Sequence, residues 1–236
     1  MEFAIPVLER GPFELPRLLE GLDDSPTTIG CDASVTTLDD DEGHGGYAVW
    51  ATVSGDGLAQ FGWYEADATI ADLAELNAVR HVLARYPSGR DAATRIDVIT
   101  DSSISVALAV RLSRGRGLGR IARANHLHPQ LLEAARAECM SRPFWATCLP
   151  GDDGRHLSEH RLVAAAHHVA WGVRRVLQDD MPFDANALEF IARLGEKRTR
   201  SKAWARAAYR EWQQNNFDLG TQSQGHQESP AATPSG

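Results

Sequence analysis

Three acidic residues lie in apolar stretches of the sequence, where a carboxylate group is costly to bury. Asp32 lies in "IGCDAS", Glu75 in "ADLAELNAV" and Asp101 in "VITDS". A buried carboxylate must be paired, protonated or bound to a cation. Three of them from separate elements could converge on a divalent metal ion, and oxygen ligands suit Mg²⁺ or Mn²⁺. Alternatively, Asp32 and Asp101 are turn or cap residues and Glu75 is a solvated helix position, although its helix neighbours are apolar.

Two adjacent histidines, His167 and His168, lie within the apolar segment "AAAHHVAW". At about 100° per residue, His167 falls on the flank of the apolar face of the predicted helix. His168 falls nearly opposite that face, so we expect it on the surface. Imidazole is a competent ligand for Mn²⁺. His167 is therefore either a further metal ligand or a partly buried histidine without a metal role.

The elements that must position these residues follow from hydrophobic periodicity. β-rich segments between residues 27 and 64, separated by turn residues, predict an antiparallel meander of three strands. From residue 70 the apolar residues recur with helical spacing, and the segment that ends at Asp101 suits a buried strand. The remaining expected elements are helices at 103–112, 129–140, 157–177, 184–194 and 201–214 and a strand in "PFWATCLP". This order predicts an α/β fold with a mixed five-stranded sheet flanked by helices.

The domain organisation follows from the same pattern. We expect an N-terminal extension at 1–26, an α/β domain at 27–177 and a C-terminal helical extension at 178–216. Residues 217–236 are polar and rich in Gly, Ser and Pro, a composition that is typical of a disordered tail.

The composition limits the kinds of partner. The chain has 236 residues, of which 43% are hydrophobic, and this is typical of a globular protein. A net charge of −8 argues against a protein that coats nucleic acid by bulk electrostatics, so any such contact needs a local basic patch. The three cysteines lack metal-type spacing and indicate buried thiols in a reducing, cytoplasmic compartment. We expect neither a signal peptide nor a membrane partner.

Taken in order, the motifs resemble those of a type 1 ribonuclease H. "IGCDASVTT" and "GGYAVW" are similar to the first two strands of that family, and "LAELNAVRHVL" is similar to its first helix. "IDVITDSSIS" is similar to the fourth strand, and "PFWATCLPG" is similar to the fifth. The resemblance covers roughly residues 27–175 and implies a ribonuclease H-like fold.

The family cuts the RNA strand of RNA–DNA hybrids, so the resemblance implies a metal-dependent endonuclease that uses two Mg²⁺ or Mn²⁺ ions. Asp32, Glu75 and Asp101 fall on its first three catalytic carboxylates, and Asp32 would bridge both ions. His167 falls on the fourth ligand, which is usually an aspartate. A histidine occurs at this place in other branches of the superfamily, including Holliday-junction resolvases. His156, in the loop before the last helix, is a second candidate for water activation or product release.

The resemblance also implies nucleic-acid contacts. Ser34 matches the serine of the family's Asp-Gly-Ser motif. The family often carries a basic protrusion where this chain has arginines interspersed with glycines, a composition that suits phosphate contacts. These arginines, which could instead lie in a solvated loop, are Arg111, Arg114, Arg116, Arg120 and Arg123. Ala71 and Asp72 replace the asparagines that read the RNA 2′-hydroxyl. A nuclease for DNA or structured RNA and a non-cutting binding domain therefore remain as alternatives.

Overall fold

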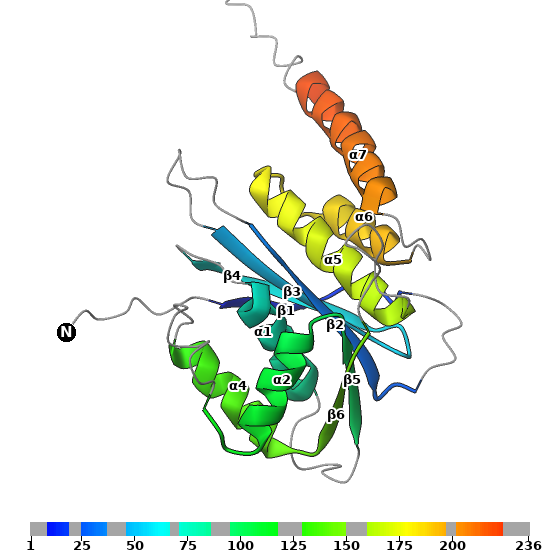
Figure 1. Ribbon diagram of the computed structural model, residues 1–236. Coiled ribbons are helices and arrows are strands. Elements are labelled where there is room, and N and C mark those ends of the chain that lie inside the picture. The colour runs from blue at the N-terminus through cyan, green and yellow to red at the C-terminus, as the bar shows by residue number, and fades with distance from the viewer. Residues whose placement is uncertain are drawn as a thin grey trace, which may run out of the picture. The chain divides into compact units, whose positions relative to one another are not determined.

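The computed structural model describes residues 9–18, 25–36, 46–66, 71–85, 95–117, 129–149, 160–196 and 202–223. The chain divides into two compact units, one within residues 1–201 and one within residues 202–236. The first unit contains a sheet with helices on both faces (Figure 1).

The sheet of the first unit is mixed and has the strand order β1-β4-β3-β2-β5-β6. Its strands are β1 (Glu9–Glu14), β2 (Thr28–Val35), β3 (Gly46–Ser54), β4 (Ala59–Ala66), β5 (Ile96–Thr100) and β6 (Phe144–Cys148). β2, β3 and β4 form the predicted antiparallel meander, while β5 pairs in parallel with both β2 and β6. The predicted fold class is confirmed: the architecture is α/β and ribonuclease H-like.

The sheet has six strands, so the prediction of five is corrected. The additional strand is β1, which comes from the segment interpreted as an extension and pairs antiparallel with β4. Its sequence, "ERGPFE", carries no alternating apolar pattern, because all but the first of its residues are exposed. Periodicity therefore gave no signal for this strand.

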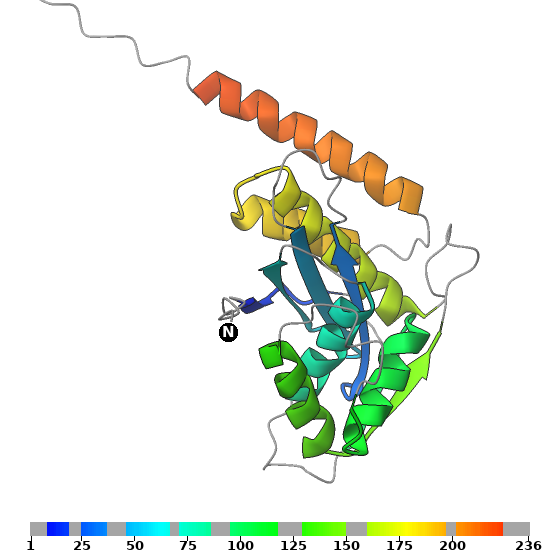
Figure 2. The same cartoon turned by 60° about the vertical axis from the view of Figure 1, so that its left-hand side comes forward.

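The helices of the first unit occupy the segments where helical periodicity was found. They are α1 (Ala71–Ala84), α2 (Ser103–Ser113), α4 (Pro129–Ser141), α5 (Arg161–Gln178) and α6 (Ala185–Glu196). α1, α2 and α4 pack together on one face of the sheet, and α5 lies on the other face with α6 against it (Figure 2). Among the described helices, none combines the length and the apolar character needed to span a bilayer.

Two features of the core set the positions of α1 and α5. α1 buries most of its length, including Leu73, Leu76 and Val79, against the sheet and its helical neighbours. On the opposite face, Gly30 of β2 allows α5 to approach the sheet closely. A Cβ atom at Gly30 would lie 2.4 Å from the carbonyl carbon of Leu162, so any larger residue would push α5 away. The glycine thus fixes the height of α5 above β2.

The second unit contains α7 (Lys202–Ser223), in which the rings of Tyr209 and Trp212 lie 5.8 Å apart. The helix continues past residue 216, where the sequence predicted the start of a disordered tail. Residues 224–236 of that tail lie outside the described residues, and the other predicted domain boundaries stay predictions.

Candidate metal centre

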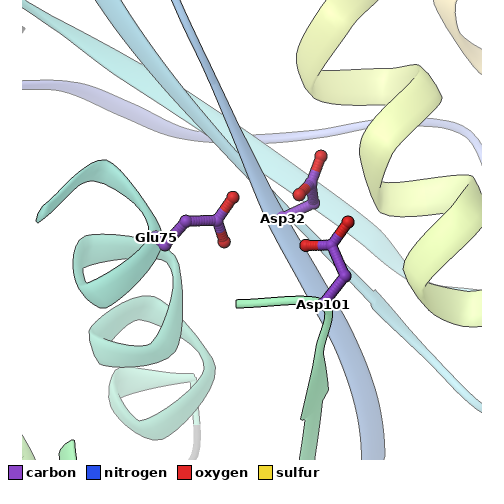
Figure 3. A group of neighbouring side chains, drawn as sticks. All are labelled: Asp32, Glu75 and Asp101. Carbon is purple, nitrogen blue, oxygen red and sulfur yellow. The ribbon is translucent and has the colours of Figure 1, made fainter. Parts of the chain in front are cut away.

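Three acidic side chains from separate elements meet at one place in the first unit. Asp32 lies on β2, Glu75 on α1, and Asp101 directly after β5. One carboxylate oxygen of each residue lies within 4.8 Å of the corresponding oxygens of the other two. Figure 3 shows the three side chains gathered at this place. Asp32 and Glu75 are buried, and Asp101 is partly buried. The interpretation of Glu75 as a solvated helix position is therefore wrong.

The parallel pairing of β2 with β5 brings the two aspartates together. The last registered pair of these strands is Gly30 with Ile99. Asp32 and Asp101 each follow two residues later, and side chains two residues apart in extended chain point to the same face. The two carboxylates therefore project side by side where β5 ends.

Glu75 reaches the same point from the opposite face of the sheet. In Figure 3 its side chain extends from α1 toward the two aspartates. The backbone N–H of Ala33 donates to Glu75 Oε1 at 3.1 Å, and the hydroxyl of Thr100 donates to Oε2 at 3.4 Å. These two donors, one from β2 and one from β5, hold the carboxylate in a fixed orientation between the strands.

His167 contacts the cluster from α5. Its Nδ1 atom lies 2.7 Å from Asp32 Oδ2, and its side chain is 20% exposed. The flank position predicted by helix geometry thus places the ring over β2. The structure thus places His167 in contact with Asp32. The set of ligand atoms that all lie within 4.8 Å of one another consists of the three carboxylates.

His168 is buried, so the prediction that it lies on the surface is wrong. The reason is that α6 covers a second side of α5. Gly172, one helical turn after His168, lies so close to α6 that a Cβ atom there would be 2.9 Å from Leu194. Burial lowers the pKa of His168 to about 4, so this imidazole is neutral at pH 7.

The charges of the cluster are poorly compensated by the protein. Burial would raise the pKa of Asp32, but the charge and hydrogen bond of His167 hold that pKa below its usual value. Burial and the negative charge of Asp32 raise the pKa of Glu75 well above its usual value. The same two causes raise the pKa of Asp101 to about 6. Mutual repulsion of this kind is relieved by a cation, so the donor set fits a hard divalent ion such as Mg²⁺ or Mn²⁺.

The structure does not bring the described arginines of the predicted basic segment to the carboxylates. α2 begins beside Asp101, and Arg111 lies in its last turn. The intervening helix is about 12–15 Å long. Arg114 and Arg116 follow Arg111 and are exposed, and the guanidinium of Arg111 donates to the carbonyl of Gly117. The other basic and loop candidates, Arg120, Arg123 and His156, lie outside the described residues.

Sequence reasoning missed one polar contact beside the cluster. Ser34 lies on β2 two residues after Asp32, and its hydroxyl accepts a hydrogen bond of 2.8 Å from Nε of Arg174 on α5. The available signal was the spacing of Arg174, seven residues after His167, because residues seven apart lie on the same side of a helix.

The strand order and the buried acidic cluster together define a ribonuclease H-like α/β protein with a candidate nuclease site. No protein-family model and no curated protein matches the chain. Among solved structures, the chain is similar to one described as "Crystal structure of LC9-RNase H1, a type 1 RNase H with the type 2 active-site motif". The TM-score is 0.46 and the sequence identity 17%, over 74% of this chain and 84% of that chain.

Proposed function

We propose that this protein is a metal-dependent endonuclease that hydrolyses the RNA strand of RNA–DNA hybrids. The observation that carries the proposal is the convergence of Asp32, Glu75 and Asp101 at the end of β5. A binding module does not need three mutually repelling carboxylates at one point, whereas phosphodiester hydrolysis with divalent cations does. The resemblance of the surrounding sequence motifs to type 1 ribonuclease H supports the choice of substrate.

Asp32, Glu75 and Asp101 would hold the cations, which we propose to be two Mg²⁺ or Mn²⁺ ions. Bound divalent cations supply Lewis-acid polarisation of the scissile phosphate and a nucleophile at neutral pH. The protein contributes preorganisation. Glu75 is oriented by its two donors, and Asp32 is oriented by His167, so neither side chain must rearrange to accept a cation.

His167 takes the place of a fourth carboxylate in this proposal and reduces the negative charge of the site. His167→Ala would remove the contact to Asp32, and changes of this kind typically cost 10- to 100-fold in metal affinity or activity. His167→Asp would restore a carboxylate ligand, so we expect it to recover more activity than His167→Ala. Equal activity of the wild-type protein and His167→Ala would remove His167 from the proposed site.

A second candidate function is favoured by the same histidine. Because a histidine at this place is found in superfamily members that cut DNA, the substrate could be a DNA junction or structured RNA instead of a hybrid. The three carboxylates would have the same role in either case. Only a comparison of substrates separates the two functions.

The test is cleavage of a labelled RNA–DNA hybrid, duplex RNA, duplex DNA and a four-way DNA junction, each in Mg²⁺ and in Mn²⁺. The variants are wild type, Asp101→Asn and Asp97→Asn. Asp97 is a matched control, because it lies on the same strand but forms a surface ion pair of 2.9 Å with Arg95. We expect cleavage of the RNA strand of the hybrid by the wild type and Asp97→Asn, and none by Asp101→Asn. Folded wild-type protein that cuts none of the substrates in either metal would contradict the proposal.

A further inference from the structure

Two polar contacts connect β2 to α5 at successive positions along both elements. The first is His167 with Asp32, at 2.7 Å, and the second is Arg174 with Ser34, at 2.8 Å. Ser34 follows Asp32 by two residues and points to the same face of the sheet. Arg174 follows His167 by seven residues and lies on the same side of α5. The guanidinium of Arg174 therefore lies on the same side of β2 and of α5 as the contact between His167 and Asp32. It lies two residues farther along β2 and seven residues farther along α5.

The second contact lies beside a free edge of β2. Pairing of β2 with β5 ends at Gly30, whereas pairing with β3 continues to Val35. Within the part of the chain that the structure describes, β2 beyond Asp32 thus has a strand neighbour on one side only. The backbone N–H of Ala33 donates to Glu75, so this edge faces the carboxylates. A substrate strand that crosses the carboxylates meets this edge, and Ser34 and Arg174, both partly exposed, lie on its α5 side.

The guanidinium of Arg174 is held in a defined plane. Nε donates to Ser34, and NH1 donates to Gln178 Oε1 at 2.9 Å. A preorganised guanidinium loses little side-chain entropy when it binds, and its planar fork matches the geometry of a phosphate group. These contacts orient the guanidinium of Arg174 and would suit it to bind a phosphate group of an extended ligand.

We propose that Arg174 binds a backbone phosphate of the substrate strand, a short distance along that strand from the phosphate that is cut. This inference rests on the proposed function and names a second contact point for the same substrate. The offset from the metal centre is about 7 Å along β2 and about 10 Å along α5. At about 3.4 Å of rise per nucleotide, the contacted phosphate lies about two to three nucleotides from the scissile one.

The first test measures hybrid binding as a function of salt concentration in an Asp101→Asn background, which prevents cleavage. Log affinity falls as log salt concentration rises, and loss of one phosphate contact makes this slope shallower by about 0.9. We expect this change for Arg174→Gln, with affinity weakened by about tenfold. Arg175→Gln is the matched control, since it removes the same charge from the next residue, whose guanidinium pairs with Asp179 at 3.1 Å. Its slope should remain that of the background protein.

The second test separates a phosphate contact from a structural role of Arg174. A methylphosphonate, which is neutral, replaces one phosphate at a time within four nucleotides of the cut on either side. At one position the loss of affinity should not add to the loss caused by Arg174→Gln. Arg174→Lys keeps the charge, so its salt slope should remain close to that of the background protein although the Ser34 contact is lost. In otherwise wild-type protein, Arg174→Gln should raise KM more than it lowers kcat.

The outcomes distinguish this inference from the proposed function. Equal salt slopes for Arg174→Gln and Arg175→Gln, or additive losses at every methylphosphonate position, overturn the role of Arg174 and leave hybrid cleavage untouched. Equal losses in Arg174→Lys and Arg174→Gln also overturn it, because they indicate packing and not charge. If Arg174→Gln does not fold, Arg174→Met, which also removes the charge, replaces it in each comparison, and the same outcomes decide the question. Absence of both hybrid binding and hybrid cleavage in wild-type protein defeats both proposals.

Discussion

Helix α1 contributes to two clusters of polar and charged side chains that differ in how their negative charge is compensated. At the first, Glu75 lies near two further carboxylates, and its hydrogen-bond donors are neutral. At the second, Glu9 of β1 accepts a hydrogen bond from Asn77 at 3.0 Å and pairs with Arg80 and with His81, the latter at 2.7 Å. The second cluster contains its own cation, whereas the first is dominated by like charges.

The pKa values of the two glutamates reflect this difference. Burial acts to raise both values. At Glu9, the hydrogen bond and charge of His81 and the charge of Arg80 outweigh burial and lower the pKa to about 2. At Glu75, the charge of Asp32 adds to burial, and the pKa rises well above its usual value. Helix α1 thus packs beside one carboxylate that stabilises the fold, Glu9 of β1, and itself carries another, Glu75, whose charge requires an external cation. A carboxylate of the second kind indicates a functional site.

The largest effect should come from breaking the uncompensated cluster. Glu75→Gln preserves the shape of the side chain and its acceptor for Ala33 but removes a charge that would hold the cations. We expect kcat/KM for hybrid cleavage to fall by more than about 100-fold, because even residues outside the ligand shell cost 10- to 100-fold. Glu9→Gln should retain most of the activity. Equal losses in the two variants would mean that the two clusters do not differ in function.

The same two variants should rank in the opposite order in stability, with Glu9→Gln less stable than Glu75→Gln. Glu9→Gln leaves Arg80 and His81, whose side chains are 12% and 10% exposed, without their carboxylate. We expect the free energy of unfolding to fall by about 2–4 kcal/mol. Without divalent cations, Glu75→Gln should be at least as stable as the wild type, since it removes like-charge repulsion. Urea denaturation in a chelator measures both, and a strongly destabilised Glu75→Gln would contradict the electrostatic account.

The pH dependence of stability should also separate the clusters. The pKa of Asp101 is raised from 3.8 to about 6, so the folded state binds more protons than the unfolded state between these values. In the absence of metal, this group favours folding at low pH, and its contribution is lost as the pH rises from about 4 to 6. We expect a loss of about 1–2 kcal/mol after allowance for the partial exposure of Asp101. Glu9, with a lowered pKa, contributes stability that is lost as the pH falls from 4.5 toward 2.

Urea denaturation of wild type and Asp101→Asn between pH 4 and 7 tests the first of these contributions. The wild-type curve should decline relative to that of the variant as the pH rises. Parallel curves would show that Asp101 titrates normally in the folded protein.

Local pattern was sufficient to predict most of the fold. Helical spacing placed Glu75 on a helix among apolar neighbours, and the apolar run before Asp101 indicated a buried strand. Contacts between elements that are far apart in the sequence could not be predicted from local pattern. The strand that carries Glu9 has exposed residues and no alternation, and His168 is buried because of α6, a separate helix. The Ser34–Arg174 contact depends on how β2 and α5 align, which neither segment specifies alone.

Asp32, Glu75 and Asp101 form an acidic cluster that we propose binds a divalent cation. The most direct measurement is thermal unfolding at pH 7 during titration with Mn²⁺, for wild type, Asp101→Asn and the control Asp97→Asn. Ligands that bind the folded state stabilise it by about 2.7 kcal/mol at 100 times Kd. We predict that Mn²⁺ raises the Tm of wild type and Asp97→Asn but leaves that of Asp101→Asn almost unchanged. Equal shifts in all three proteins, or a shift in none, would contradict the claim.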